Sequence, residues 1–262
     1  MNIIEINNLS FDYGKKIIFN GLNLNIEKNT FTTIIGNSCG KTSLAQILCG
    51  NLKYNGEVLI DNIIVTKKNK RELSRKIKLL SENPEKYFLK ETVIDEITYL
   101  CDGSDVIDNF NYLKKLFQIN DILYKNPMSL SAGEKQLISF IQSILLNPKI
   151  IIIDNAFTMV DSVLKKKIFE YLKKQKENKK MTIINITNDI EESLYGENIV
   201  VMYNGEIKYD CKIVDILKKE KQLKKIGFDI PFIISLSNKL KYYDLVDHTY
   251  YSIRKLVDDL WQ

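Results

Sequence analysis

The stretch that decides the fold is TTIIGNSCGKTSLAQILC, residues 32–49. Its first part, residues 32–35, is a short apolar and β-branched run of the kind that forms a buried strand. A glycine follows at Gly36, and after Gly40-Lys41-Thr42 the apolar residues recur at helical spacing as far as Cys49. The stretch therefore predicts a strand, a glycine loop and a helix in direct succession.

The glycine loop has the residues of a phosphate-binding loop. Converging backbone N–H groups and the positive end of the helix attract phosphate, Lys41 adds a full charge, and the Thr42 hydroxyl can hold Mg²⁺. The usual pattern is Gly-x-x-x-x-Gly-Lys-Ser/Thr, but one residue is missing between Gly36 and Gly40, so the loop is tighter. Taken alone, Gly-Lys-Thr could also occur by chance. The expected phosphate contacts are Gly36, Asn37, Ser38, Cys39, Gly40, Lys41, Thr42 and Ser43.

Strands and helices alternate along the rest of the chain. Four consecutive isoleucines at residues 150–153 end in Asp154, which predicts a core strand with an acid at its C-terminal end. This alternation predicts a parallel sheet with helices packed on it, and ligands bind beyond the carboxyl ends of such strands. The expected strands are 3–11, 22–26, 32–35, 57–60, 77–80, 150–154, 182–187 and 199–203, and the expected helices are 43–49, 92–101, 106–118, 132–146, 163–175 and 190–195.

Composition excludes several classes of protein. Hydrophobic residues make up 45% and charged residues 27%, which excludes a disordered or collagen-like chain. No apolar run approaches a membrane span of about 20 residues, and the start lacks the pattern of a secretion signal, so we expect a cytoplasmic chain. The four cysteines lack metal-ligand spacing, which predicts reduced thiols and no zinc site. The net charge of +5 is spread along the chain without an aromatic-interleaved basic stripe, so we expect no nucleic-acid partner.

The text Leu130-Ser131-Ala132-Gly133-Glu134-Lys135-Gln136 resembles the LSGGQ signature of ABC-type ATPases, and the isoleucine strand after it resembles their Walker B strand. Asp161 resembles the D-loop acid and Tyr13 the adenine-stacking aromatic of the same family. From the residues alone, Tyr13 could be a plain strand-edge aromatic and Asp161 a helix cap. The resemblance covers about residues 1–210. It implies an α/β P-loop NTPase fold with a parallel core sheet, an antiparallel N-terminal β-subdomain and a helical subdomain at about residues 85–146.

Two further stretches narrow the resemblance. Glu82-Asn83-Pro84-Glu85 followed by Thr92-Val93, and Gly227-Phe228-Asp229-Ile230-Pro231, are similar to ATPase subunits of energy-coupling-factor transporters. We therefore expect a C-terminal helical extension over residues 211–262. The resemblance implies a peripheral subunit at the cytoplasmic face of the membrane that powers uptake of a vitamin or metal ion. Its partners would be a second ATPase subunit, a transmembrane coupling subunit and a substrate-binding membrane subunit.

In this family two subunits enclose two ATP molecules with Mg²⁺, and each site combines the phosphate loop of one chain with the signature of the other. The resemblance thus adds further expected ATP contacts to the phosphate loop: Tyr13, Asp154, Ser131, Gly133, Glu134 and Asp161. It places Thr42, Asp154 and Glu82 at the metal.

Three residues depart from the family pattern at positions that carry chemistry. Asn155 stands where the family has the glutamate that polarises the attacking water, Asn188 replaces the switch histidine, and Glu82 replaces the Q-loop glutamine. An amide cannot serve as a general base, a role worth roughly 10²–10⁴-fold in rate. The signature residues that act on a partner's ATP are retained.

This asymmetry favours a heterodimer in which this chain is the catalytically impaired member and lends its signature to a partner. Drift in a chain that has lost its role is the alternative, giving a non-hydrolysing nucleotide-binding or scaffold protein that kept the fold. An ABC-type protein acting on ribosomes or DNA is disfavoured, because the chain lacks a long coiled coil and a strong basic patch.

Overall fold

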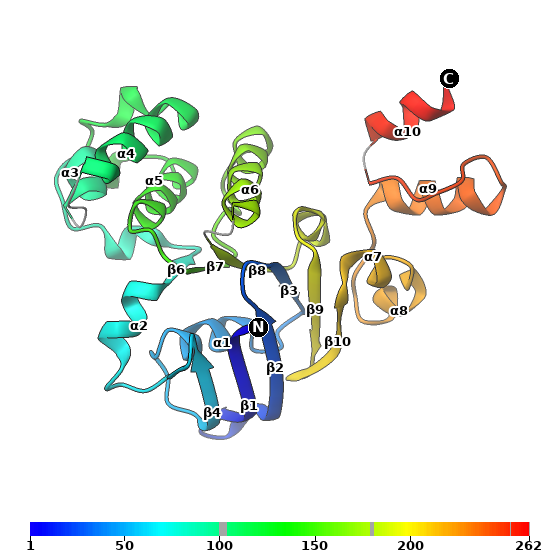
Figure 1. Cartoon of the computed structure of the whole chain (residues 1–262), viewed down its shortest axis with the longest axis horizontal. Coiled ribbons are helices and arrows are strands. Elements are labelled where there is room, and N and C mark those ends of the chain that lie inside the picture. The colour runs from blue at the N-terminus through cyan, green and yellow to red at the C-terminus, as the bar shows by residue number, and fades with distance from the viewer. Residues whose placement is uncertain (100–103, 179–180, 252, 262) are drawn as a thin grey trace.

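The computed structural model describes residues 1–99, 104–178, 181–251 and 253–261. It contains two sheets, helices on either side of the larger one, and a helical C-terminal region (Figure 1). The strands are β1 (Asn2–Tyr13), β2 (Lys16–Glu27), β3 (Phe31–Ile35), β4 (Asn55–Ile60), β5 (Ile63–Ile64), β6 (Ile77–Ser81), β7 (Ile150–Asp154), β8 (Thr182–Thr187), β9 (Asn198–Tyr203) and β10 (Glu206–Lys212). The α-helices are α1 (Lys41–Leu48), α2 (Lys70–Lys76), α3 (Val93–Thr98), α4 (Ser104–Phe117), α5 (Ala132–Leu145), α6 (Ser162–Glu177), α7 (Ile213–Ile216), α8 (Glu220–Lys225), α9 (Phe232–Tyr242) and α10 (Ile253–Leu260). Short 3₁₀ helices are η1 (Pro84–Tyr87), η2 (Asn120–Ile122), η3 (Pro127–Ser129) and η4 (Ile190–Tyr195).

The larger sheet has the strand order β10-β9-β3-β8-β7-β6. All its neighbours pair in parallel except β10, which is antiparallel to β9. Every residue of β3, β7 and β8 is buried, as expected for apolar runs covered on both faces. Asp154 pairs in register with Ser81 of β6, and Ile35 with Thr187 of β8, so these strands end at one edge. That edge carries the candidate site.

The smaller sheet is antiparallel, with the order β2-β1-β4-β5. Buried and exposed residues alternate through most of β2, because one face of this sheet packs on the core. That core also contains apolar residues of α1 and of the larger sheet, such as Leu44, Ile152 and Ile184. Helix α1 therefore lies in the packing between the two sheets, and its N-terminus is fixed relative to both.

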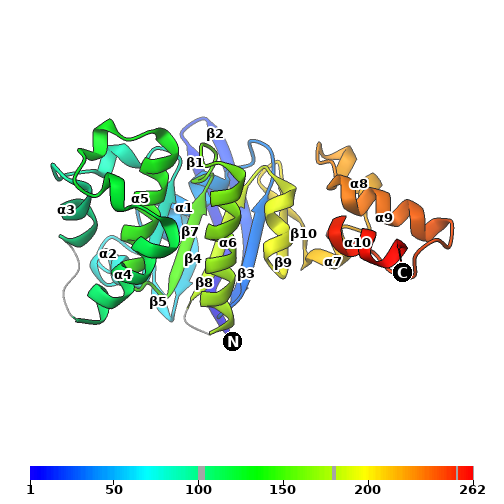
Figure 2. The ribbon, with the colours of Figure 1, turned by 90° about the horizontal axis from the view of Figure 1, so that it is seen from above.

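A second core lies under helices α3, α4, α5 and α6, which are grouped on one side of the larger sheet (Figure 2). Aromatic rings dominate its centre: Phe140 contacts Phe117, Phe157 and Tyr171 edge-to-face at centroid distances of 5.7–6.0 Å. Such pairs stabilise by about 0.5–1.5 kcal/mol beyond the area they bury. This core holds α5, and hence the signature text at its start, against the sheet.

The α/β fold expected from the sequence, with its parallel core sheet and antiparallel N-terminal sheet, is confirmed. Several details differ from the expectations. Elements α2, β5 and β10 were not expected, and β10 was missed because its alternating residues lie at an exposed edge. Strand β2 begins at Lys16 rather than at residue 22. The helix expected at residues 190–195 is present as a 3₁₀ helix. The helix expected at 92–101 ends at Thr98, and the last two residues of that range lie outside the described part of the chain.

The C-terminal region begins where β10 ends at Lys212, and α7–α10 lie beyond the β10 edge of the sheet in Figure 1 and Figure 2. A third core joins this region to the sheet: Phe228 and Ile234 belong to the same buried cluster as Ile35 of β3 and Val201 of β9. The four elements, called the extension below, therefore share a buried core with the sheet. None of the helices in the described ranges combines the length and apolar character needed to cross a bilayer.

Candidate functional site

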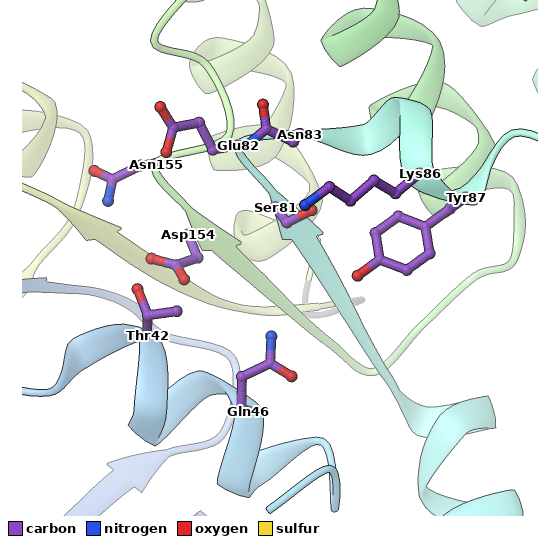
Figure 3. A pocket seen from close by; sticks show the side chains of 9 residues that line it. All are labelled: Thr42, Gln46, Ser81, Glu82, Asn83, Lys86, Tyr87, Asp154 and Asn155. Atoms are coloured by element: carbon purple, nitrogen blue, oxygen red, sulfur yellow. The ribbon is translucent and has the colours of Figure 1, made fainter. Parts of the chain in front are cut away.

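Two cavities lie at the edge where the strands end, and Thr42 lines both of them. The first, of about 350 Å³, is lined by Tyr13, Lys16, Ile18 and the phosphate-loop residues Ser38–Ser43. The second, of about 220 Å³, has Thr42, Gln46, Ser81, Glu82, Asn83, Lys86, Tyr87, Asp154 and Asn155 around it (Figure 3). The two cavities therefore adjoin at Thr42, and their lining residues run from Tyr13 to Asn155.

Tyr13 stands above the phosphate loop. Its hydroxyl lies 3.3 Å from Oγ of Ser43, and its ring contacts Phe11 edge-to-face at 4.8 Å. The side chain is 57% exposed, so the ring is accessible to a ligand. An exposed aromatic ring beside a phosphate loop is suited to stacking with a nucleotide base.

The lysine of the phosphate loop forms hydrogen bonds to other residues of this chain. Lys41 is buried, and its Nζ donates hydrogen bonds to the backbone oxygen of Gly36 and, at 2.9 Å, to Oδ1 of Asn188. Burial lowers the pKa of Lys41, while the charges of Cys39 and Asp154 oppose that shift. A lysine ammonium has three N–H donors, and these two acceptors use two of them, so the third is left for a phosphate oxygen. Asn188 would then share Lys41 with a bound phosphate.

The loop backbone is close-packed at both of its glycines. A Cβ atom on Gly36 would lie 2.4 Å from the backbone oxygen of Met202, and one on Gly40 would lie 2.4 Å from the Ile18 side chain. Gly40 also has a φ of 94°, the left-handed region in which only glycine is unstrained. No side chain within the described residues caps α1, so its first N–H groups face the cavity.

Asp154 and Thr42 face each other across the second cavity (Figure 3). Burial raises the pKa of Asp154, with Glu82 adding to the rise, while a hydrogen bond with Thr42 and the charge of Lys41 lower it. Its Oδ1 is buried without a hydrogen-bond partner among the described residues. Mg²⁺ prefers oxygen ligands, and this free oxygen of Asp154 lies near the Thr42 hydroxyl and the Glu82 carboxylate. These three residues therefore fit the expected metal.

Asn155 and Glu82 lie side by side at the far end of this cavity (Figure 3). Asn155 has a left-handed backbone (φ 49°) and donates its N–H to the backbone oxygen of Ile186 at 2.9 Å. Asparagine tolerates this conformation better than most residues. The cavity therefore contains two carboxylates, Glu82 and Asp154, but an amide at the end of β7.

The signature residues lie apart from both cavities. Ser131 caps α5: its Oγ accepts from the N–H of Glu134 at 3.3 Å, and the Glu134 carboxylate accepts from the N–H of Ser131 at 2.8 Å. These hydrogen bonds lower the pKa of Glu134. A Cβ atom on Gly133 would lie 2.6 Å from the backbone oxygen of Met159, so only glycine fits there. Ser131 is exposed and is free to meet another molecule.

Asp161 caps α6 by accepting from the N–H groups of Val163 and Leu164, both at 3.0 Å. The structure thus gives this residue the capping role that the sequence left open beside the D-loop role. Neither Asp161 nor Ser131, Gly133 or Glu134 is among the residues around the two cavities. The chain brings the phosphate loop, Asp154, Asn155, Glu82 and Asn188 together, and leaves the signature elsewhere.

Comparison with known proteins identifies the family. Residues 19–158, just over half of the chain, match the family model described as ABC transporter. The energy-coupling factor transporter ATP-binding protein EcfA1 of Ligilactobacillus salivarius is 32% identical over all of this chain and 96% of its own length. EcfA1 of Mycoplasma mobile is 31% identical over 95% of this chain and 93% of its own length.

This chain belongs to the ABC transporter family of ATP-binding proteins. The resemblance seen in the sequence is thereby confirmed. Two solved structures agree with this placement. CbiO1 from Clostridium perfringens, part of an ABC transporter complex, shares the fold at a TM-score of 0.73 and 24% identity, over 90% of this chain and 99% of its own. The dimeric bacterial ABC transporter cassette MJ0796 is 26% identical, with a TM-score of 0.70, over 80% of this chain and 98% of its own.

Some residues that shape the site of this ABC family member were not predicted from the sequence. Gln136 is buried, and its amide donates to the backbone oxygen of Glu82 at 3.0 Å while accepting from the N–H of Met159 at 3.1 Å. It ties the Glu82 loop to the segment before α6. Its position at the end of the signature could have identified Gln136 from the sequence. Gln46 and Lys86 line the second cavity, but no pattern in the sequence marks them as site residues.

Proposed function

We propose that this chain is an ATP-binding subunit of an energy-coupling-factor transporter that powers uptake of a vitamin or metal ion. In this proposal it is the catalytically impaired member of a heterodimer. The names of its EcfA1 relatives support the transporter class. The observation that carries the impairment is the amide of Asn155, directly after β7, in a cavity where Thr42 and Asp154 are otherwise arranged for a nucleotide.

Nucleotide binding is supported by the order of groups along the two cavities. Tyr13 offers a ring face for the base, the N-terminus of α1 and Lys41 offer positive charge for the phosphates, and Thr42 with Asp154 would hold Mg²⁺. When bound, Mg²⁺ neutralises phosphate charge. An asparagine at 155 can orient a water molecule by hydrogen bonding but cannot take its proton. The site would therefore bind ATP and turn it over slowly.

The exposed start of α5 supports the second role, which is to serve a partner's ATP. Ser131 and Gly133 lie at a helix N-terminus, where partial positive charge and hydrogen-bond donors favour a phosphate. Their separation from this chain's own cavities means that they can act only on a nucleotide held by another subunit. A partner with an intact phosphate loop and a carboxylate at the position of Asn155 would complete the active site.

The surface near Glu82 supports attachment to membrane partners at the cytoplasmic face. Tyr87 and Leu89, which follow the Glu82 loop, are 66% and 71% exposed. Apolar side chains displayed next to a nucleotide-dependent loop suit a transmembrane coupling subunit, which would carry the motion to a substrate-binding membrane subunit. We place this chain there as a peripheral subunit without nucleic-acid contacts.

The proposal is tested by ATP hydrolysis in the assembled heterodimer. Ser131→Arg in this chain should abolish most turnover, because the new side chain fills the place of the partner's γ-phosphate. Ser74→Arg, at an exposed serine on α2, is the matched control and should leave turnover unchanged. Full activity of the S131R heterodimer would exclude the proposed lending of the signature.

A second function is favoured by the internal bonds of Lys41. Gly36 and Asn188 accept from two of the three N–H groups of Lys41, and this partial satisfaction of the buried charge would help a chain that only scaffolds a complex to stay folded without nucleotide. That function predicts no nucleotide-dependent pairing with any ABC ATPase. Sedimentation with and without ATP distinguishes the two functions.

A further inference from the structure

The turn that ends α8 lies against the phosphate loop. A Cβ atom on Gly227 would lie 3.2 Å from Nδ2 of Asn37, closer than most contacts of this kind. The two residues are 190 positions apart in the chain, one in the extension and one directly after Gly36. Asn37 directly precedes Ser38, which lines the first cavity, so the contact joins the start of the phosphate loop to a region that lines neither cavity.

The position of Gly227 is fixed by the way α8 ends. Its N–H bonds the backbone oxygen of Lys224 at 3.1 Å, and the N–H of Phe228 bonds that of Leu223 at 3.0 Å. These two bonds and a φ of 85° form a Schellman motif, which requires a residue that adopts the left-handed conformation easily. Phe228 and Leu223 are both buried in the third core, which anchors the turn.

The loop side of the contact rests on the same core. Ile35, the residue before Gly36, belongs to the cluster that contains Phe228. Gly36 itself is backed by the oxygen of Met202 on β9, the strand that pairs with β10 at the edge nearest the extension. Asn37 is exposed, so beyond this backing its side chain has the Gly227 turn as its neighbour.

We propose that the Gly227 turn positions the phosphate loop through Asn37, so that the extension and nucleotide binding are energetically coupled. The loop is one residue short, and support from outside replaces contacts that a longer loop makes within itself. Coupling of this kind is reciprocal: whatever shifts the extension changes nucleotide affinity, and a bound nucleoside diphosphate or triphosphate changes the extension by the same factor. The inference rests on the proposed nucleotide binding for one of its two readouts.

A double-mutant cycle of Gly227→Ala and Asn37→Ala in the full chain tests the coupling. The methyl group of G227A presses on Asn37, and ADP affinity measured by calorimetry should fall about fivefold, the lower end of typical coupling. In the N37A background the same substitution should change affinity less than twofold. Equal effects of G227A in both backgrounds would overturn the proposal.

Gly50→Ala is the matched control. Gly50 ends α1 in the same motif, with bonds from its N–H to Ile47 and from Asn51 to Gln46, and a φ of 67°. The nearest atom to its Cβ position is 3.8 Å away, so the substitution adds the same backbone strain without a close contact. It should lower thermal stability as G227A does, but should leave ADP affinity unchanged.

Hydrogen exchange without nucleotide gives the second readout. G227A should speed exchange in residues 36–43, and N37A should speed exchange in residues 220–231, whereas G50A should do neither. Unchanged exchange in both segments would also overturn the proposal. If no variant, including the parent chain, binds ADP, nucleotide binding itself is refuted and the exchange data still decide whether the contact couples the two regions. If G227A does not fold, the exchange of residues 220–231 in N37A decides the question: faster exchange supports the coupling, and unchanged exchange overturns it.

Discussion

Helix α1 begins at the phosphate loop and helix α5 at the signature, yet the hydrogen bonding of their N-termini differs. Helix α1 starts at Gly40 with no side-chain cap among the described residues, so its N–H groups are open to a ligand. Helix α5 begins after Ser131, and the Ser131–Glu134 capping box satisfies the N–H groups of these two residues. The chain thus prepares its own site for phosphate but stabilises the signature internally. The retained signature residues therefore have two roles, and one of them, capping α5, needs no nucleotide.

We expect the largest effect from restoring a carboxylate in the second cavity, beside the start of α1. Asn155→Glu should raise phosphate release by this chain's site, in the heterodimer, by about 100-fold, the lower end of the contribution of a general base. Asn147→Glu is the control, because Asn147 has a similar left-handed backbone (φ 46° against 49°) but is exposed and lies outside the cavity. Rapid release by the unmodified chain alone would contradict the impairment.

Removing the charge at the α1 side should have the next largest effect. Lys41→Ala deletes the cation that faces the phosphates, and ATP affinity should weaken by about 30-fold, or about 2 kcal/mol, the range for a hydrogen bond to a charged group. Titration calorimetry measures it. Lys208→Ala, an exposed lysine paired with Glu206, should bind ATP as the parent chain does. Equal affinity of K41A and the parent chain would show that phosphates are held elsewhere.

At the α5 side, two substitutions of Ser131 separate its two purposes. Ser131→Ala should lower the free energy of unfolding by about 1 kcal/mol, because the cap is lost. Ser131→Asp retains a capping oxygen and should keep that stability, but its charge repels a γ-phosphate and should abolish partner turnover. Urea unfolding and heterodimer ATP hydrolysis are the two measurements. A loss of stability in S131D equal to that in S131A would contradict the capping role.

We expect the smallest effect from Asp61, which lies outside both helix starts. Its effect on stability shows how much a surface ion pair contributes in this protein. Asp61 accepts from Lys76 at 2.6 Å and from Lys149 at 2.9 Å, and these lysines lower its pKa from the ordinary value of 3.8. Because the pKa is lower in the folded state, the stabilisation is present above pH 3.8 and is lost as the pH falls below it. Asp61→Asn should cost about 0.5 kcal/mol near pH 7, typical of a partly exposed ion pair. Urea unfolding should show this difference vanish at pH 2.5; an equal difference at both pH values would exclude the ion pairs as its cause.

Most of the core sheet could be predicted because its strands are local patterns. The isoleucine run at 150–153 and the apolar run before Gly36 are buried strands on any reading of their residues. Strand β10 was missed because its edge position leaves alternate residues exposed, and such a pattern is weak. The 3₁₀ form of η4 was also missed, since short helices of either kind share the same residues.

The residues alone show which chemical groups this chain possesses: a short phosphate loop, an amide at 155 and at 188, a carboxylate at 82, and a signature that keeps Ser131 and Gly133 but has Glu134 in place of glutamine. Which of these groups meet depends on the three-dimensional fold. It placed Lys41 against Asn188, Asn155 beside Glu82, and Gly227 against Asn37, while leaving Ser131 outside the cavities. The physical reason is that residue types follow from local spacing, whereas these contacts depend on strand order and on the cores that fix the loops between strands.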